Sequence, residues 1–288
     1  PHCIMIKKAS EEPCCCKNNC FPTYLDFYSL YGTYSYRPKL YVEYTNNDMY
    51  ADHQKYHTFE NGRSGTGSVN LFNGSFLFAH SDIALKSAKL PLSVSHLYRP
   101  DFDEVKYGLG WKLSVEQTVD VIQKHGVYAV YTDAQGKRHY FMEDSDGSIK
   151  DDAGLGLTFT HECECYCGCE TKYSIADEQG NKMLFNENGK LIQLTDAHEN
   201  ISYLSYTNGN LTKVVDGNGN AATLTYQNGK LYQIIDADGD ALTFGYDGDL
   251  LKNITYPSSD GDSRVTIFDY NNSDNVRKLI KVTDISGI

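Results

Sequence analysis

The sequence has little of what membrane-spanning, nucleic-acid-binding or helical proteins need. No run approaches the roughly 18 consecutive apolar residues of a membrane-spanning helix. Lysine and arginine number 26 against 38 acidic residues, and the resulting net charge of −12 argues against nucleic-acid binding, which requires clustered cations. The most regular part of the sequence, between 189 and 246, also lacks apolar positions at i, i+3 and i+4, so amphipathic helices are not expected there.

Catalytic motifs are missing as well. The sequence contains no G-x-S-x-G nucleophile elbow, no H-E-x-x-H metal motif and no phosphate-binding loop. Its acidic residues gather in turns, where they already have a structural use. We therefore expect neither an enzyme nor a cofactor.

The sequence does contain a repeat with a period of 20 residues between 189 and 246. Each copy begins Gly-x-Leu, continues through a β-branched run and an aspartate turn, and ends on tyrosine. A fixed period of this kind is typical of stacked units that cannot bury their apolar faces alone. The repeat columns contain Leu191, Leu211 and Leu231; Asp196, Asp216 and Asp236; and Tyr206, Tyr226 and Tyr246.

Each copy is predicted to form two short antiparallel strands. Its second half alternates in polarity, with Leu224 and Tyr226 on one face and threonine on the other. Asn-Gly pairs at 208–209 and 228–229 predict tight hairpins between copies, because both residues tolerate positive φ. We expect the tyrosines to align on the sheet, and Tyr226, with neighbours on both sides, to contribute more stability than Tyr206.

Within each copy, the aspartate is predicted to accept hydrogen bonds from the amides of its own turn. Gly219 and Gly239 are expected to take the left-handed conformation there. The first copy has Glu199 at that position, which predicts a more strained turn or a turn of another type. The run Asp236–Asp240 also resembles a calcium loop, but its sixth position is Ala241 instead of glycine. We favour turn formation, because it accounts for every copy.

These residues resemble the Rhs, or tyrosine–aspartate (YD), repeat family. The match consists of the Gly-x-Leu, Asp-x-x-Gly-Asn and terminal tyrosine positions over about 185–288. The resemblance implies an all-β fold, in which stacked hairpins form a curved or spiralling antiparallel sheet after a β-rich lead-in segment. Members of that family often close such sheets into a shell around a C-terminal toxin, and teneurin ectodomains carry the same repeats.

The resemblance implies a non-catalytic structural fragment of a secreted or cell-wall-associated protein. It would contribute to a β-shell that encloses or presents a C-terminal effector, with the remaining repeats, a C-terminal toxin domain or cell-surface glycans as partners. The sequence begins without methionine and ends inside an Asp-x-x-Gly turn, so we expect a piece of a longer protein with any export signal upstream. A glycan-binding or adhesion surface is the alternative function, because 23 tyrosines could offer rings to sugars.

Composition divides the chain ahead of the repeats at 185–288 into three segments. Residues 1–48 are predicted to end a β-rich module, because Arg37–Tyr44 alternates as a strand and resembles the closing strand of a carbohydrate-binding-like β-sandwich. Residues 49–67 are polar and glycine-bearing, as in a linker. Residues 68–184 are predicted to be the lead-in, with irregular units that begin near 112.

The lead-in contains a hairpin signal, an alternating strand and the single tryptophan. Asn73-Gly74 lies between two apolar-rich runs, and Pro91–Tyr98 alternates in polarity. These motifs, followed by Gly-x-Gly-Trp111, resemble in their order the segment that precedes YD repeats. Trp111 is expected to anchor the core, with sugar stacking as the rival role. Earlier Asp-x-x-Gly turns begin at Asp133 and Asp177.

The nine cysteines fall into two clusters and Cys3, and this odd number leaves at least one without an intrachain partner. The second cluster has C-x-C spacing, which places its thiols on one side of a strand but differs from the usual C-x(2–4)-C spacing of zinc sites. Free thiols, disulfides and a metal site stay open, in that order of preference. His53 and His57 are a further candidate pair of metal ligands. We favour the interpretation that they are solvent-exposed side chains of the linker. The candidate metal ligands are Cys163, Cys165, Cys167 and Cys169.

Overall fold

The computed structural model describes residues 56–71, 74–124, 127–144, 147–161, 171–257, 263–271 and 278–285. Nearly all of their regular structure is antiparallel β-sheet, so the predicted all-β fold of hairpin strands is confirmed. The module predicted at 1–48 and all nine cysteines lie outside the described residues.

The first sheet has five strands in chain order, each antiparallel to the next. A short 3-10 turn, η3 (Gly62–Ser64), joins its first two strands. The predicted hairpin near Gly74 is present, because Asn70 N donates to Ser75 O at 2.8 Å and Gly74 N donates to Asn70 O at 2.9 Å. The strands are β1 (Tyr56–Glu60), β2 (Thr66–Asn70), β3 (Phe76–Leu85), β4 (Leu92–Tyr98) and β5 (Trp111–Leu113).

The linker expectation for 49–67 is wrong in its second half, where β1 lies. Strand β1 pairs with β2 from Tyr56↔Asn70 to Glu60↔Thr66 and forms the edge of the sheet. Every residue of β1 is exposed. Because neither face is buried, the sequence shows none of the apolar alternation by which a strand is recognised.

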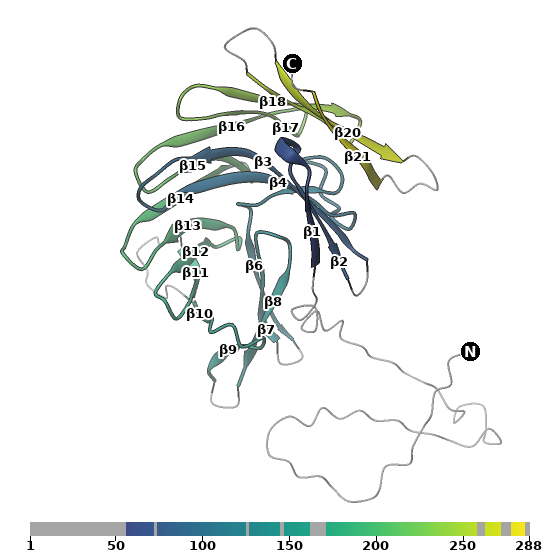
Figure 1. Ribbon diagram of the computed structural model, residues 1–288. Coiled ribbons are helices and arrows are strands. Elements are labelled where there is room, and N and C mark those ends of the chain that lie inside the picture. Colours follow the sequence, from purple (N-terminus) through teal and green to yellow (C-terminus); the bar gives the residue numbers. More distant parts are fainter. Residues whose placement is uncertain are drawn as a thin grey trace, which may run out of the picture. The chain divides into compact units, whose positions relative to one another are not determined.

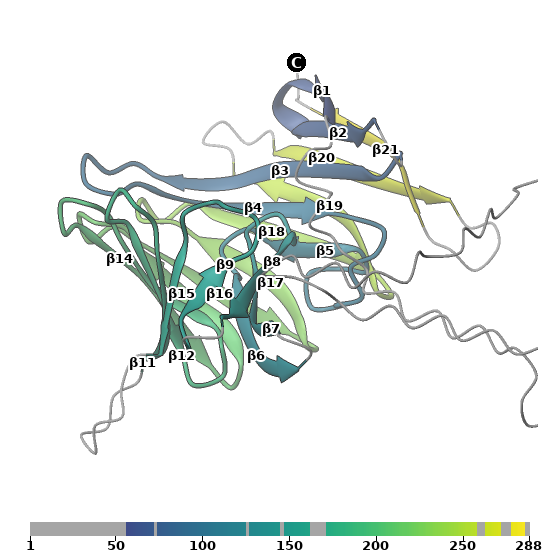
Figure 2. The same ribbon diagram turned by 90° about the horizontal axis from the view of Figure 1, so that it is seen from below.

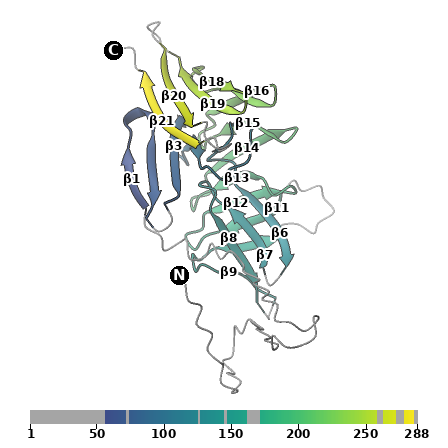
Figure 3. The same cartoon turned by 90° about the vertical axis from the view of Figure 1, so that its right-hand side faces the viewer.

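The second sheet is a meander of 16 strands in chain order. It begins at β6 and runs through the boundary expected at 185 without a break. In Figure 3 its strands follow one another from β9 at the lower end to β20 and β21 at the upper end. The strands are β6 (Thr118–Lys124), β7 (Val127–Thr132), β8 (Arg138–Glu143), β9 (Ile149–Asp151), β10 (Thr158–His161), β11 (Thr171–Ala176), β12 (Lys182–Asn186), β13 (Leu191–Thr195), β14 (Ile201–Thr207), β15 (Asn210–Val215), β16 (Ala221–Gln227), β17 (Lys230–Ile235), β18 (Ala241–Asp247), β19 (Leu250–Tyr256), β20 (Arg264–Asn271) and β21 (Lys278–Ile285).

The repeats alternate between buried and exposed residues as predicted. In β16, Ala222 and Leu224 are buried, whereas Thr223 and Thr225 are exposed. The Asn-Gly hairpins have two-residue loops, and at 228–229 both residues have positive φ (51° and 76°). This is the type I′ geometry, whose twist matches that of the flanking strands.

Each repeat also carries a β-bulge beside its hairpin, which the sequence did not predict. Between β14 and β15 the register shifts between Ser205 and Tyr206, and Thr212 is the extra residue. The equivalent extra residues in β17 and β19 are Tyr232 and Lys252. A bulge bends its strand and increases the right-handed twist. Its regular recurrence therefore curves the sheet in one direction.

The curvature brings the first strand of the long sheet back to its middle. Val119 N in β6 donates to Gly189 O at 2.8 Å, and Leu191 N donates to Gln117 O at 3.1 Å. A Cβ at Gly189 would lie 1.9 Å from Val119 O, so only glycine allows this approach. The sheet thus coils onto itself through backbone hydrogen bonds without closing into a barrel.

The five-stranded sheet lies against the inner, apolar face of the long sheet, where β3 and β4 run alongside β14–β18 (Figures 1 and 2). Trp111 lies at the centre of the contact and is 0% exposed. Its ring centroid is 4.8 Å from that of Phe268, and its Nε1 donates to Tyr270 Oη at 2.8 Å. The prediction of a core anchor is confirmed, and full burial rules out sugar stacking on this ring.

Candidate functional site

The predicted site residues begin with the repeat aspartates, whose carboxylates organise their own turns. Asp216 Oδ1 accepts hydrogen bonds from the amides of Asn218 and Asn220, both at 2.9 Å, and Oδ2 accepts one from Asn220 Nδ2 at 2.8 Å. Asp196 and Asp236 accept the equivalent two amide bonds at 2.9 Å. These bonds are the Asx-turn pattern. The pKa of Asp196 is lowered, first by the Asn200 side chain and then by turn amides.

The turn glycines have the conformation that this loop requires. Gly219 and Gly239 have φ of 91° and 89°. Glu199, at the same position of the first copy, has φ of 63°, and its amide makes the same bond to the carbonyl of Asp196 (3.0 Å) as Gly219 makes to Asp216 (3.0 Å). The turn is therefore of the same type in all copies, and the expected strain falls on Glu199, because a non-glycine residue in this region is unfavourable.

The middle turn is also a contact point with the five-stranded sheet. Gly217 N donates to Leu90 O at 3.2 Å, in the loop between β3 and β4, and Ser202 Oγ donates to the same carbonyl at 3.1 Å. A Cβ at Gly217 would lie 2.3 Å from Lys89 O. The other two copies have alanine at this position, so glycine distinguishes the repeat that contacts the loop between β3 and β4.

The tyrosine column lies on the inner face but its members differ in hydrogen bonding. All three rings are partly buried against the core. Tyr226 Oη donates to Leu211 O at 2.8 Å and receives the hydroxyl of Tyr107 at 3.2 Å. The buried hydroxyls of Tyr206 and Tyr246 have no hydrogen-bond partner. Burial raises the pKa of all three phenols well above the ordinary value.

A charged cluster that the sequence analysis missed lies between the sheets. Asp82 Oδ1 accepts His80 Nδ1 at 3.0 Å, and Oδ2 accepts His96 Nδ1 at 2.6 Å, with all three side chains 0% exposed. Tyr256, from the long sheet, donates to Ser81 O at 3.2 Å and lies 3.0 Å from His80 Nε2. Both ring nitrogens of His80 and both carboxylate oxygens of Asp82 thus have a polar partner inside the core.

The cluster is a link between the sheets and has no open face for a substrate. The His96 ring lies 4.9 Å from that of Phe244, and its Nε2 is buried without a partner. Burial raises the pKa of Asp82, but the charge of His96 and the hydrogen bonds of both histidines outweigh burial, so this pKa lies below the ordinary 3.8. The signal in the sequence was the His-x-Asp spacing on a strand that is otherwise apolar on its inner face.

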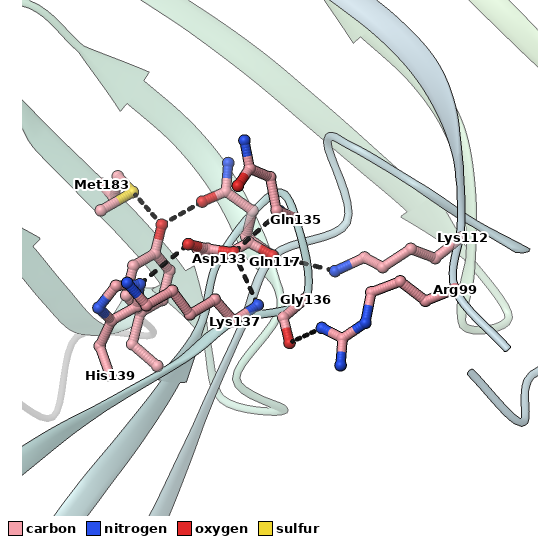
Figure 4. A network of polar contacts seen from close by, with 10 residues as sticks. Arg99, Lys112, Gln117, Asp133, Gln135, Gly136, Lys137, His139 and Met183 are labelled. Atoms are coloured by element: carbon pink, nitrogen blue, oxygen red, sulfur yellow. Dashed lines mark hydrogen bonds and ion pairs between the residues drawn. The ribbon is translucent and has the colours of Figure 1, made fainter. Parts of the chain in front are cut away.

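A second polar network holds the turn at Asp133, as Figure 4 shows. Asp133 Oδ1 accepts the amides of Gln135 (2.8 Å) and Lys137 (2.9 Å), and Oδ2 lies 2.9 Å from His139 Nε2. Burial raises the pKa of Asp133, yet the His139 contact and the turn amides together lower it.

Two cations, Lys112 on β5 and Arg99 in the loop between β4 and β5, bind this turn from the other side (Figure 4). Lys112 Nζ donates to Asp133 O at 3.0 Å, and Arg99 Nη1 donates to Gly136 O at 3.1 Å. Both cations also lie over the Phe102 ring, at 5.0 Å for Arg99 and 5.9 Å for Lys112. The network therefore fixes the first hairpins of the long sheet to the five-stranded sheet.

The other predicted ligands are not brought together in the described part of the chain. His57 is exposed on β1, and its suggested partner His53 lies outside the described residues, as do Cys163, Cys165, Cys167 and Cys169. Among the described residues, no three histidine, cysteine or acidic side chains are placed to hold a metal ion. In the same residues, no helix has the length and apolar character needed to cross a bilayer.

Comparison with known proteins adds one finding. Residues 66–141 match a family model described as a domain of unknown function, DUF6531. No curated protein matches the chain. The matched segment runs from β2 into β8 and includes Asp82, His96, Trp111 and Asp133, which are among the residues that join the two sheets.

Proposed function

We propose that this chain is a non-catalytic structural segment of a secreted or cell-wall-associated YD-repeat protein, and that it forms part of a β-shell enclosing or presenting a C-terminal effector. The observation that carries the proposal is the uninterrupted 16-stranded meander, coiled by a bulge in each repeat and filled on its inner face by the five-stranded sheet. Such a wall is built from main-chain hydrogen bonds and lengthens by adding hairpins.

The end of the long sheet that is formed by β21 is suited to pairing with further strands. In the described residues β21 has a strand partner, β20, on one edge alone, and the amide of Leu279 on β21 donates to Tyr98 Oη at 2.9 Å. Ile280 on β21 is 64% exposed, and Phe59 on β1 is 42% exposed. Further hairpins of the same repeat would cover both.

The flanking reading frame of the parent gene tests the proposal. We expect further 20-residue repeats downstream, followed by a region without the repeat. That region should resist protease in the intact parent protein and become sensitive in the Gly189→Ala variant, whose Cβ would overlap Val119 O at 1.9 Å. Gly229→Ala is the matched control, because a Cβ there meets nothing within 4 Å. Equal digestion of wild type and both variants would contradict an enclosing shell.

The alternative of a glycan-binding tyrosine column finds less support. Its three rings pack on the inner face, with Lys190 Nζ 5.1 Å from the Tyr206 ring centroid. Rings engaged in this way do not offer a free face to a sugar.

A further inference from the structure

The two sheets have four edge strands among the described residues, and β1 differs from the other three. Strand β5 has three residues, and the loop before it is held by Leu109 N, which donates to Asp249 O at 2.7 Å. Strand β6 is hydrogen-bonded to Gly189, and β21 is the edge on which the proposed further hairpins would pair. Strand β1 contains no lysine or proline, and its pairing with β2 has no bulge. Edge strands commonly avoid association through such features, so β1 is open to pairing.

The hydrogen bonds around β1 and β2 determine which backbone groups lie at the free edge. Asn61 N, directly after β1, donates to Gly65 O at 2.9 Å, toward β2. In β2, Asn70 N donates to Ser75 O at 2.8 Å, away from β1. Successive residues of a strand direct their N–H and C=O groups to opposite sides, and both bonds give the same alternation. The odd-numbered residues of β1 therefore face β2, and the even-numbered residues face the free edge.

The three residues at the free edge are complementary to a second copy of themselves. They are Tyr56, Thr58 and Glu60. In an antiparallel pairing about Thr58, Tyr56 lies opposite the partner's Glu60, and Thr58 lies opposite the partner's Thr58. Every donor then meets an acceptor, and about six backbone hydrogen bonds form, two for each facing pair. A contact of this isologous kind closes as a two-fold dimer and does not propagate.

The aromatic side chains on one face of β1 add to this complementarity. A row of rings leads from the core to the edge, with Phe78 at 6.3 Å from Trp111 and Phe76 at 6.5 Å from Phe78. The row ends at Phe59, which is stacked on Phe76 at 6.4 Å and is 42% exposed. In the two-fold pairing the partner's His57 lies opposite Phe59, at a position without backbone hydrogen bonds, where facing side chains come closest. The dimer would thus cover the open end of the row in both copies.

Charge favours the antiparallel arrangement. Strand β1 has one carboxylate, Glu60, and it accepts a hydrogen bond from Thr66 Oγ1 at 2.9 Å. In the two-fold pairing the two copies of Glu60 lie at opposite ends of the paired strands, on the order of 14 Å apart at a rise of about 3.4 Å per residue. This separation exceeds the screening length of roughly 8 Å at physiological ionic strength. A parallel pairing would place the two carboxylates side by side.

We propose that β1 is a dimerisation edge, on which a second copy of this chain pairs antiparallel about Thr58 and joins the two five-stranded sheets into one. The dimer goes beyond the shell proposed above and does not depend on it. It uses the backbone edge of β1, whereas further hairpins would cover the ring of Phe59 from a face of the sheet.

Sedimentation velocity of the full chain tests the edge between about 5 and 500 µM, because a pairing of this size belongs with weak, transient interfaces. We expect the sedimentation coefficient to rise with concentration from that of a monomer to that of a dimer. Thr58→Lys should raise the dissociation constant about tenfold, because it places two like charges directly opposite each other. Thr58→Pro should also weaken the dimer, because it removes an N–H at the free edge and none that faces β2.

Thr225→Lys is the matched control, because Thr225 is an exposed threonine on β16, inside the long sheet. It should dimerise as wild type. Urea melts followed by Trp111 fluorescence should coincide for wild type and Thr58→Lys, so that unfolding does not account for the lost association. Amide exchange measured by NMR reports the register independently of any variant. The amides of Thr58 and Glu60 should exchange more slowly as the concentration rises, and that of His57 should not change.

The proposal is overturned if the chain stays monomeric at the highest concentration, if Thr58→Lys dimerises as wild type, or if Thr225→Lys loses association equally. Slow exchange of the Thr58 amide in a monomer would also overturn it, because a segment of the same chain, such as Arg37–Tyr44, would then occupy the edge.

Discussion

Replacing Tyr226 by phenylalanine should destabilise the chain, whereas the same replacement at Tyr206 should not. Both substitutions keep the ring and remove only the hydroxyl. At Tyr226 the loss leaves Leu211 O, a buried carbonyl, without its 2.8 Å donor and breaks the 3.2 Å contact with Tyr107. Loss of one partner of a buried hydrogen bond costs about 1–3 kcal/mol.

At Tyr206 the hydroxyl has no partner, so the change removes a group that was unfavourably desolvated. Phenylalanine should therefore be neutral or should stabilise the fold by up to about 1 kcal/mol. Tyrosine and phenylalanine both present an aromatic ring to the Lys190 ammonium, so this cation–π contact is kept in the variant. The difference between the two variants should amount to roughly 1–4 kcal/mol, or a gap of several degrees in Tm for a chain of this size.

Urea denaturation followed by the fluorescence of Trp111, the single tryptophan of the sequence, measures both variants in the same assay. Tyr270→Phe is a further member of the series and should behave like Tyr226→Phe, because its hydroxyl donates to Leu251 O at 2.7 Å. Equal losses at 206 and 226 would show that the hydroxyls do not decide the energetics of the column and would refute the reasoning.

Three further predictions concern the turns and the buried cluster. Gly217→Ala should destabilise the chain by about 1–3 kcal/mol, because its Cβ would overlap Lys89 O. In the same urea melts, Ala237→Gly should change stability by less than about 1 kcal/mol. Equal effects would mean that the loop between β3 and β4 does not pack on the turn at Gly217. Glu199→Gly should raise stability by roughly 0.5–1 kcal/mol in the same assay by relieving a φ of 63°, and a loss would show that the glutamate is not strained. Because the folded-state pKa of Asp82 lies below 3.8, its contribution is complete above that value and is lost as pH falls through the folded-state pKa. Wild type should therefore lose more stability than Asp82→Asn on acidification below pH 3.8, and parallel losses in thermal melts would contradict this.

The long sheet could be predicted because its information is local. The Asn-Gly pair at 228–229 and the alternation around Leu224 each determine the conformation of a few adjacent residues. The aspartate turn is equally local, since Asp216 bonds to residues two and four positions ahead. Repetition in the sequence then indicated that the same unit recurs.

The bulges could not be predicted, because no residue type marks them. Thr212, Tyr232 and Lys252 share a position in the ladder but no chemical property. The extra residue follows from the register of the hairpin, which depends on both strands together.

The contacts between the sheets were equally hidden. His80 and Asp82 are neighbours on one strand, but Tyr256 lies far from them in sequence, and no local pattern indicates that these segments meet. Nothing near Gly217 in the sequence indicates that the carbonyl of Lys89 lies against it. Pairings of this kind depend on how distant segments pack, which a local pattern does not record.

The bulge in each repeat has a consequence for how such a gene can change. Curvature is generated separately inside each unit of 20 residues, together with the hairpin and the aspartate turn that complete it. Unequal recombination between similar copies would therefore add or remove whole units in frame, each with its own hairpin, turn and bulge. A copy that touches the inner sheet, such as the one with Gly217, could not be exchanged in this way without losing that contact.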